Sequence, residues 1–413
     1  FANTTASNNT AVGNQALTSN TTGYQNTAVG SATLDATTTG YKNTAVGYAS
    51  LGANTTGLEN TSIGHNSLAA NTTASYNVAV GRSALAASNA TYATAVGHSS
   101  LFSNTSGQYN TAVGVSSLYS NTTAGYNTAV GHGAVYTNTT GANNTGIGYY
   151  ALFANTTGTL NTAVGANSLK TNVTGEGNTA VGNNALEDNT GHSNTAVGNR
   201  ASYENTSGRD NVAIGNNALN TNTTSDYNTA VGSFALYDNT GANNTSVGYR
   251  SLYENTTGNQ NAAVGGSALQ NNTTGDSCVA IGYGALGANT TANENTAVGK
   301  SALKVNTTGA SNTAVGAFSL DANTTGGNNV AVGNNALTTN IDGFHNTAIG
   351  FDTLKDHSTG NNNTAVGSQA LENSTSGIQN TAIGSTAMQT ITTASRNTAV
   401  GHGSMQAATG ADY

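Results

Sequence analysis

Residues 43–59 read NTAVGYASLGANTTGLE, and this 17-residue unit recurs along the chain. Its first glycine, Gly47, is one of 24 equivalent glycines from Gly13 to Gly401, and each of them is preceded by Val or Ile. Of the 23 intervals between these reference glycines, 20 are 17 residues long and three are 16. A unit this short cannot enclose its own core, so each copy must bury its apolar side against neighbouring copies. The sequence therefore predicts a stack of coils.

The composition is uniform, which predicts a single continuous repeat domain over residues 1–413. The chain has ten Lys and Arg and 18 Asp and Glu, and its basic residues form no stripe along the sequence. We therefore expect no nucleic-acid partner. No apolar run approaches the ~20 residues of a membrane span, and we expect no membrane insertion. The one cysteine, Cys278, replaces a repeated Asn and has no partner for an internal disulfide.

Clustered Thr and Val, two glycines in the unit and no 3.6-residue period favour strand over helix. The Thr two residues before the repeated Val is replaced by Val78, Val212, Val279 and Val330. We therefore expect this Thr and the Val to face inward, and the small residue between them, such as Ala11, Ser62 or Gly146, to face outward.

A second inward anchor is expected four residues after the reference glycine, where Leu stands in 20 of 24 repeats, as at Leu17. All three short repeats lose their residue between this Leu and the next strand, which places a surface turn there. The unit thus predicts a flattened coil with two short strands and two turns.

Asn stands four residues before the glycine in 22 of 24 repeats, and stacked amides can hydrogen-bond along the axis. This row predicts an asparagine ladder and parallel stacking. With ~4.8 Å between strands, the coils predict a rod of roughly 115 Å. The fold class expected is an all-β parallel β-solenoid of about 24 coils.

The segments 77–81, 211–215, 278–282 and 329–333 read NVAVG, NVAIG, CVAIG and NVAVG. They resemble the S-V-A-I-G motif in the heads of YadA-type trimeric autotransporter adhesins. The resemblance covers essentially the whole chain, and it implies a left-handed parallel β-roll, often trimeric, displayed on a bacterial surface for attachment. The longer unit is similar to repeats in tail-fibre-like proteins. The 17-residue unit is longer than the usual 14 or so of the adhesin heads.

The sequence offers no catalytic constellation, and we expect no enzymatic activity, cofactor or metal site. The histidines stand at variable positions that we expect to be solvated turns: His65, His98, His132, His192, His345, His357 and His402. Structural calcium would need a repeated Gly-Asp turn, whereas Asp35, Asp188, Asp238 and Asp321 are isolated.

Sixteen Asn-x-Ser/Thr sequons fall in phase at the long turn, where a glycan would have room. The alternative is that Asn, Thr and Gly are simply good turn formers. The candidate acceptors of N-linked glycans are Asn3, Asn20, Asn54, Asn71, Asn104, Asn121, Asn138, Asn155, Asn172, Asn205, Asn222, Asn255, Asn272, Asn289, Asn306 and Asn323.

An outward aromatic stripe is expected just after the Leu anchor, for stacking on sugars or packing against another chain. Its members are Phe102, Tyr119, Tyr136, Phe153, Tyr203, Tyr237 and Tyr253. The alternative is that these rings only cover the edge of the turn. Ice binding by a flat threonine array is a minor alternative function. It is only minor because the adjacent Thr21 and Thr22 would point to opposite sides of an extended segment and would not share one face.

The function predicted is that of a structural, extracellular or cell-surface fibre subunit that is glycosylated. Its expected partner is itself, by axial stacking or as a lateral homo-oligomer such as a trimer. Because the sequence shows no cap over the end strands, head-to-tail polymerisation is expected. The alternative is an adhesin head or tail-fibre shaft that binds a glycan or another surface ligand.

Overall fold

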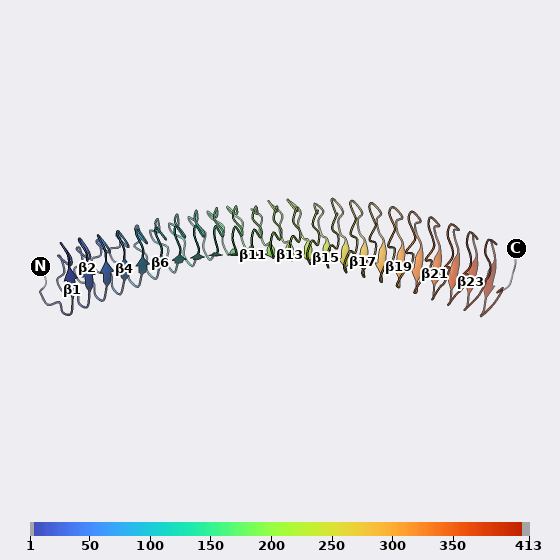
Figure 1. Ribbon diagram of the computed structural model, residues 1–413, viewed down its shortest axis with the longest axis horizontal. Coiled ribbons are helices and arrows are strands. Elements are labelled where there is room, and N and C mark those ends of the chain that lie inside the picture. Colours follow the sequence, from blue (N-terminus) through green and yellow to red (C-terminus); the bar gives the residue numbers. More distant parts are fainter. Residues whose placement is uncertain (1–3, 407–413) are drawn as a thin grey trace. The chain divides into compact units, whose positions relative to one another are not determined.

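The computed structural model describes residues 4–406, which form an all-β parallel solenoid of about 23 turns without a helix. The predicted fold class is therefore confirmed. The chain divides into two compact units, Phe1–Gly208 (unit 1) and Arg209–Tyr413 (unit 2). Figure 1 shows the repeated design within each unit, with one strand in every coil.

Each strand has three residues, which are the Thr-Ala-Val of the repeat or its substitutes. In unit 1 the strands are β1 (Thr10–Val12), β2 (Thr27–Val29), β3 (Thr44–Val46), β4 (Thr61–Ile63), β5 (Val78–Val80), β6 (Thr94–Val96), β7 (Thr111–Val113), β8 (Thr128–Val130), β9 (Thr145–Ile147), β10 (Thr162–Val164), β11 (Thr179–Val181) and β12 (Thr195–Val197). In unit 2 they are β13 (Val212–Ile214), β14 (Thr229–Val231), β15 (Thr245–Val247), β16 (Ala262–Val264), β17 (Val279–Ile281), β18 (Thr296–Val298), β19 (Thr313–Val315), β20 (Val330–Val332), β21 (Thr347–Ile349), β22 (Thr364–Val366), β23 (Thr381–Ile383) and β24 (Thr398–Val400).

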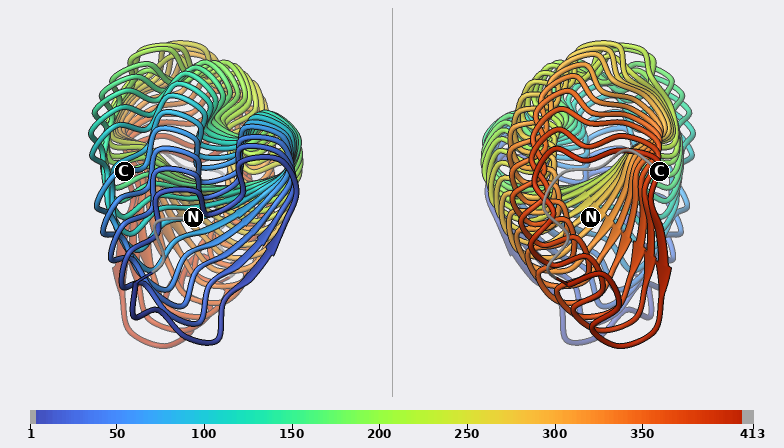
Figure 2. Two further views of the ribbon diagram at one scale, coloured as in Figure 1. Left: turned by 90° about the vertical axis from the view of Figure 1, so that its left-hand side faces the viewer. Right: turned by 90° about the vertical axis from the view of Figure 1, so that its right-hand side faces the viewer.

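Within each unit, every strand pairs in parallel with the strand of the next coil, and like residues face like residues. In unit 1, Thr162 pairs with Thr179 and Ala163 with Ala180. The short repeats keep this register, as in the pairing of Val78 with Thr94, 16 residues apart. The deletions are therefore absorbed in the turn, as predicted. The end-on views of Figure 2 show the successive coils of each unit lying one behind another, so equivalent residues form rows.

The predicted facing of the strand is wrong. The middle residue is the buried one, as at Ala28, Ser62 and Gly146, whereas the flanking Thr and Val are half-buried or exposed in nearly every coil. The Thr-to-Val substitutions do not show which strand face is buried, because a β-branched apolar side chain is also accepted on a partly exposed strand face. The interior of the coil, in contrast, has room only for a small side chain.

Packing against the Leu anchor explains this limit. A Cβ built on Gly146 would lie 2.5 Å from Cγ2 of Val135, the residue at the Leu position of the preceding coil. Among the 24 repeats, Gly146 is the one glycine in the middle of a strand, and Val135 is the one valine at the Leu position. The smaller strand residue thus makes room for the β-branched anchor, as close packing requires.

The Leu anchor is buried as predicted, but it lies in a turn and not in a second strand. The leucines at this position have φ between +48° and +57°, and the residue two before each, such as Ala49, is also left-handed. Two left-handed residues so close together bend the chain and prevent an extended strand. Neighbouring turns are still joined by backbone hydrogen bonds, such as that from N of Leu51 to O of Ser67 (3.0 Å).

The reference glycine is required for two reasons. Its φ lies between +125° and +143°, a region that side chains disfavour. A Cβ on Gly165 would also lie 2.4 Å from the carbonyl oxygen of Gly182 in the next coil. Close stacking of the coils therefore depends on this glycine.

Candidate functional surfaces

One surface of each unit carries the outward side chains of the strands, and we call it the threonine–valine face. It consists of the first and third residues of β1–β12 in unit 1 and of β13–β24 in unit 2. The first residue is Thr in 19 strands, Val in four and Ala in one, and the third is always Val or Ile. No charged side chain stands at either position.

The third residues give this face an apolar row. Ile147 in unit 1 and Ile281 in unit 2 are 39% and 43% exposed, respectively. The threonine hydroxyls of the strands make no hydrogen bond within the part of the chain that the structure describes. Rows of methyl and hydroxyl groups thus repeat at the strand spacing of ~4.8 Å.

The predicted asparagine ladder is present in both units. In unit 1, Oδ1 of Asn144 accepts hydrogen bonds from N (3.0 Å) and Nδ2 (3.2 Å) of Asn161 in the next coil. Nδ2 of Asn144 itself donates to the carbonyl oxygen of Gly158 (2.8 Å). The buried amides therefore join successive coils and satisfy backbone groups of the long turn.

The sequon asparagines form a second buried ladder. In unit 1, Nδ2 of Asn155 donates to Oδ1 of Asn138 (2.7 Å) and to the carbonyl oxygen of Gly158 (3.0 Å). Asn289 in unit 2 bonds in the same way to Asn272 (2.8 Å) and Ala292 (3.1 Å). Both hydrogens of the amide nitrogen are used in each case.

This burial contradicts the room that was expected for a glycan. Asn3 lies outside the described residues. The other fifteen candidates, Asn20, Asn54, Asn71, Asn104, Asn121, Asn138, Asn155, Asn172, Asn205, Asn222, Asn255, Asn272, Asn289, Asn306 and Asn323, are all buried. The turn backbone is at the surface, but its Asn side chain points inward, and a glycan on that nitrogen would open the coil.

The first threonine of the N-T-T turn is also used in stacking. Oγ1 of Thr139 donates to the carbonyl oxygen of Thr156 in the next coil (3.1 Å), and Thr307 bonds to Thr324 in the same way (3.0 Å). These hydroxyls therefore do not form a free array. Among the described residues, the strand threonines and second threonines of the N-T-T turn, such as Thr140, have hydroxyls without a hydrogen bond in the protein.

The expected aromatic stripe exists as short stacks. Phe102, Tyr119, Tyr136 and Phe153 of unit 1 stack in sequence with ring centroids 5.1–5.2 Å apart. Tyr237 and Tyr253 of unit 2 stack at 5.3 Å. Because stacked rings cover one another's faces, the interior of a stack presents ring edges, which are unsuited to stacking on a sugar. Tyr203 lies beneath the guanidinium of Arg200 (5.1 Å).

A second row of rings escaped the sequence analysis. Tyr76, Tyr92, Tyr109 and Tyr126 of unit 1 stack at 5.0–5.2 Å. Each stands just before the ladder position, which is Ala93 in the case of Tyr92 and Asn in the others. The signal was their spacing of one repeat, which places equivalent side chains in one row. This row is exposed.

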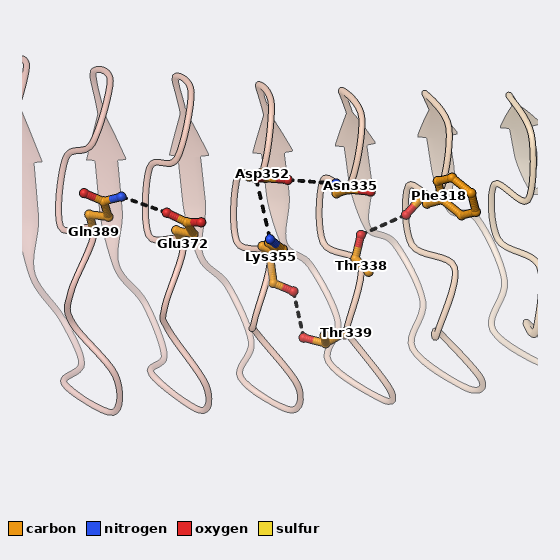
Figure 3. A network of polar contacts seen from close by, with 8 residues as sticks. All are labelled: Phe318, Asn335, Thr338, Thr339, Asp352, Lys355, Glu372 and Gln389. Atoms are coloured by element: carbon orange, nitrogen blue, oxygen red, sulfur yellow. Dashed lines mark hydrogen bonds and ion pairs between the residues drawn. The ribbon is translucent and has the colours of Figure 1, made fainter.

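Charged and polar side chains also pair, both within a coil and between coils. In unit 2, Nδ2 of Asn335 donates to Oδ1 of Asp352 (2.9 Å), whose other oxygen lies 3.6 Å from Nζ of Lys355 (Figure 3). Nε2 of Gln389 donates to Oε2 of Glu372 (2.7 Å). These contacts occur at scattered positions and support the stack locally.

One histidine prediction is wrong. His65, His98, His132, His345 and His402 are exposed and His192 is half-buried, but His357 is fully buried. His357 replaces a ladder asparagine: its Nε2 lies 2.8 Å from O of Gly360, and its Nδ1 lies 3.2 Å from Oγ of Ser374. Burial lowers the pKa of this imidazole below its usual 6.5.

The remaining reactive groups do not converge on a site. Cys278 is buried in the other ladder, where its Sγ lies 3.3 Å from O of Ala292, and burial raises the pKa of its thiol to about 11. Burial also raises the pKa of Asp321, although Lys304 nearby acts in the opposite direction. Among residues 4–406 no three His, Cys, Asp or Glu gather as a metal site, and no helix long and apolar enough to cross a membrane occurs.

The comparisons with known proteins add no relative: no protein-family model matches the chain, and no curated protein matches it.

Proposed function

We propose that the chain is a structural, non-catalytic subunit whose units associate side by side with further copies of the same chain through the threonine–valine face. The observation that carries this proposal is the row of partly exposed Val and Ile side chains on a face without charge. Continuous apolar surface of this kind marks association sites in soluble proteins. Repetition of one face along a stack also favours pairing of like surfaces about a symmetry axis.

An extracellular fibre or attachment shaft is the setting that this proposal fits best. The repeat resembles adhesin heads, which are displayed on cell surfaces, and a solenoid of this type offers a long repetitive surface for attachment. The trimeric state of those heads is the form of self-association that we propose first. A surface ligand, such as a host glycan, would then bind outside the covered face.

The association is tested by measuring the mass of the chain in solution by sedimentation or mass photometry. We expect a multiple of 41.0 kDa for the unmodified chain. The double variant Val181→Lys/Val197→Lys places two charges on the face of unit 1 and should yield monomers. The matched control, Asn183→Lys/Asn199→Lys, changes exposed residues just after the reference glycine, where Lys300 occurs naturally. A monomeric unmodified chain, or equal loss of assembly in both variants, would reject the proposal.

Ice binding is the second candidate, and the same face now favours it for a specific reason. The strand threonines are aligned in register and their hydroxyls are unbonded within the described residues, as at Thr162 and Thr179. Such rows of hydroxyl and methyl groups are able to order water. A thermal hysteresis assay decides: no activity in a preparation shown to be monomeric would eliminate this candidate, because its face is then uncovered.

A further inference from the structure

Unit 1 contains an aromatic pocket of about 280 Å³ that belongs neither to the threonine–valine face nor to the ladders. It is lined by Ser116, His132, Gly133, Tyr136, Tyr150 and Phe153, from three successive coils. Gly133 leaves room for the ring of Tyr150, which forms one wall of the pocket. A Cβ at this position would lie 2.6 Å from the ring of Tyr150, which leans over the glycine.

The rings around the pocket are inclined to one another. The ring centroid of Tyr150 lies 4.7 Å from that of Phe153 at 58°, and 5.4 Å from that of His132 at 52°. The stacked row from Phe102 to Phe153 has angles of 5–14° instead. Tyr149 also packs on Tyr150, with ring centroids 4.1 Å apart at 36°. Because inclined rings cover each other only in part, some ring-face area is left for a ligand.

The surroundings of the pocket carry no negative charge. The sequence has no Asp or Glu between Glu59 and Glu176, a stretch that includes every lining residue and the neighbouring coils. A cationic ligand would therefore be held by the aromatic faces and not by an ion pair.

Unit 2 contains the corresponding cluster with a cation already in place. Phe234 and Tyr237 of one coil and Tyr249 and Tyr253 of the next occupy the first, second and fifth places after their reference glycines. The guanidinium Cζ of Arg250 lies 5.2 Å from the ring centroid of Tyr253, 5.5 Å from that of Tyr249 and 5.9 Å from that of Phe234.

Arg250 makes no ion pair with any residue that the structure describes, so the aromatic rings are the main partners of its charge. A planar guanidinium suits such a place, because it stacks on ring faces and is weakly hydrated. In the cluster of unit 1, Tyr150 stands at the place of Arg250 and Gly133 at that of Phe234. That cluster therefore has rings and a pocket but no cation of its own.

We propose that this pocket binds the guanidinium group of an arginine side chain from a partner polypeptide, in the manner in which unit 2 binds Arg250. The binding energy comes from the faces of Tyr150 and Phe153, with Ser116 and His132 at the rim. Because a cation over aromatic rings contributes modestly, the affinity for one arginine side chain is on the order of 1 mM.

The experiment measures binding of Nα-acetyl-arginine amide to the full chain by saturation-transfer NMR, and equilibrium dialysis at millimolar probe concentrations counts the bound molecules. The matched probe is Nα-acetyl-citrulline amide, which has the same shape but a neutral urea group. We expect saturable binding of the arginine probe, with upfield shifts of its side-chain protons, and at least tenfold weaker binding of the citrulline probe.

Two variants locate the site. Tyr150→Arg supplies the guanidinium from the chain itself, and it should weaken binding of the arginine probe at least tenfold. Tyr150 has φ +52° and Arg250 has φ +53°, so the backbone already accepts arginine in this place. Arg250→Asn uncovers the rings of unit 2 and should raise the number of bound probes from one to two, because asparagine occurs naturally there, as at Asn335.

Several results would overturn the assignment. Equal binding of the two probes would show that charge is not recognised, and displacement of the arginine probe by a neutral hexose would show a carbohydrate pocket instead. Binding that is unchanged in Tyr150→Arg would place the probe elsewhere. If circular dichroism shows that Tyr150→Arg does not fold, the stoichiometry of Arg250→Asn decides, and a value that stays at one contradicts the proposal.

Discussion

At the scale of single residues, the middle residue of each strand is the most restricted position of the coil. Ala163 of β10 is fully buried, and it lies between Gly146 and Ala180 of the neighbouring strands. The residue beside it, Thr162, is half-buried on the outer face. Ala163 must therefore be small to fit inside the coil, whereas the adjacent Thr162 can be larger because it lies on the outer face.

Replacing Ala163 by Val should overpack the coil and destabilise the chain by about 1–3 kcal/mol. The control Thr162→Val should change stability by less than about 0.5 kcal/mol, because valine occurs at this outer position in four other strands. Urea unfolding followed by circular dichroism measures both variants. A control that is more destabilising than Ala163→Val would mean that the facing of the strand is misassigned.

His357 makes the stability of unit 2 depend on pH. Its pKa in the folded chain is lowered by burial, so the unfolded chain binds the proton more readily. The stabilisation is complete above the unfolded value of 6.5 and is lost as the pH falls below it, at up to about 1.4 kcal/mol per pH unit.

The variant His357→Asn restores the usual ladder residue, and it should abolish this part of the pH dependence. Thermal unfolding at several pH values between 7.5 and 5 provides the measurement. The other titrating groups are common to both chains, so the difference between them isolates the histidine. Parallel pH profiles for the two chains would contradict the prediction.

At the scale of the element, the coil is held by rows of side chains as much as by its three-residue strand. In Asn144→Ala, N of Asn161 and O of Gly158 lose the buried side-chain partners that Asn144 provides. Each unsatisfied group costs about 1–3 kcal/mol, so we expect a loss of stability in this range or above it.

Cys278→Asn restores a ladder amide and should stabilise unit 2 by about 1 kcal/mol. Denaturant midpoints test both changes, and a neutral Asn144→Ala would show that the ladder contributes little.

The burial of the second ladder also predicts the covalent state of the chain. Because the side chains of the fifteen described sequon asparagines are buried inside the coil, the folded protein should carry no glycan on them. After expression in a host that performs N-glycosylation, peptide mapping by mass spectrometry should find these fifteen asparagines unmodified, whatever is attached at sequons with exposed Asn side chains, such as Asn143 and Asn362. A glycan on any of the fifteen would contradict this.

At the scale of the whole molecule, the same contacts between adjacent coils repeat along each stack. Within a unit, every strand contacts only the strands of adjacent coils. Solenoids of this kind behave as sums of repeat and nearest-neighbour terms.

A fragment of residues 1–208 should therefore keep the β-sheet spectrum of the intact chain. Circular dichroism and thermal unfolding of this fragment test the prediction, with an equally long fragment that starts in the middle of a coil of unit 1 as the control. A fragment 1–208 without β structure would show that unit 1 needs more than its own neighbouring coils.

Periodicity alone was enough to predict the architecture. The spacing of the reference glycines predicted parallel stacked coils, the 22 asparagines predicted a ladder, and the three short repeats located the turn. These features follow from the register of the stack: when every coil has the same length, each residue type must lie beside its own kind.

Which side of the strand faces inward was decided only by the tertiary structure. Thr and Val are compatible with either face of a strand, so their exchange carried no information, whereas the space left beside Leu decided that Ala lies inside. The same holds for the sequon asparagines and His357, because a surface turn can direct its side chain into the coil. The pocket beside Gly133 likewise arises from contacts between residues of different coils. The repeat by itself determined the order of the rows, and the width of the coil determined which rows are buried and which are exposed.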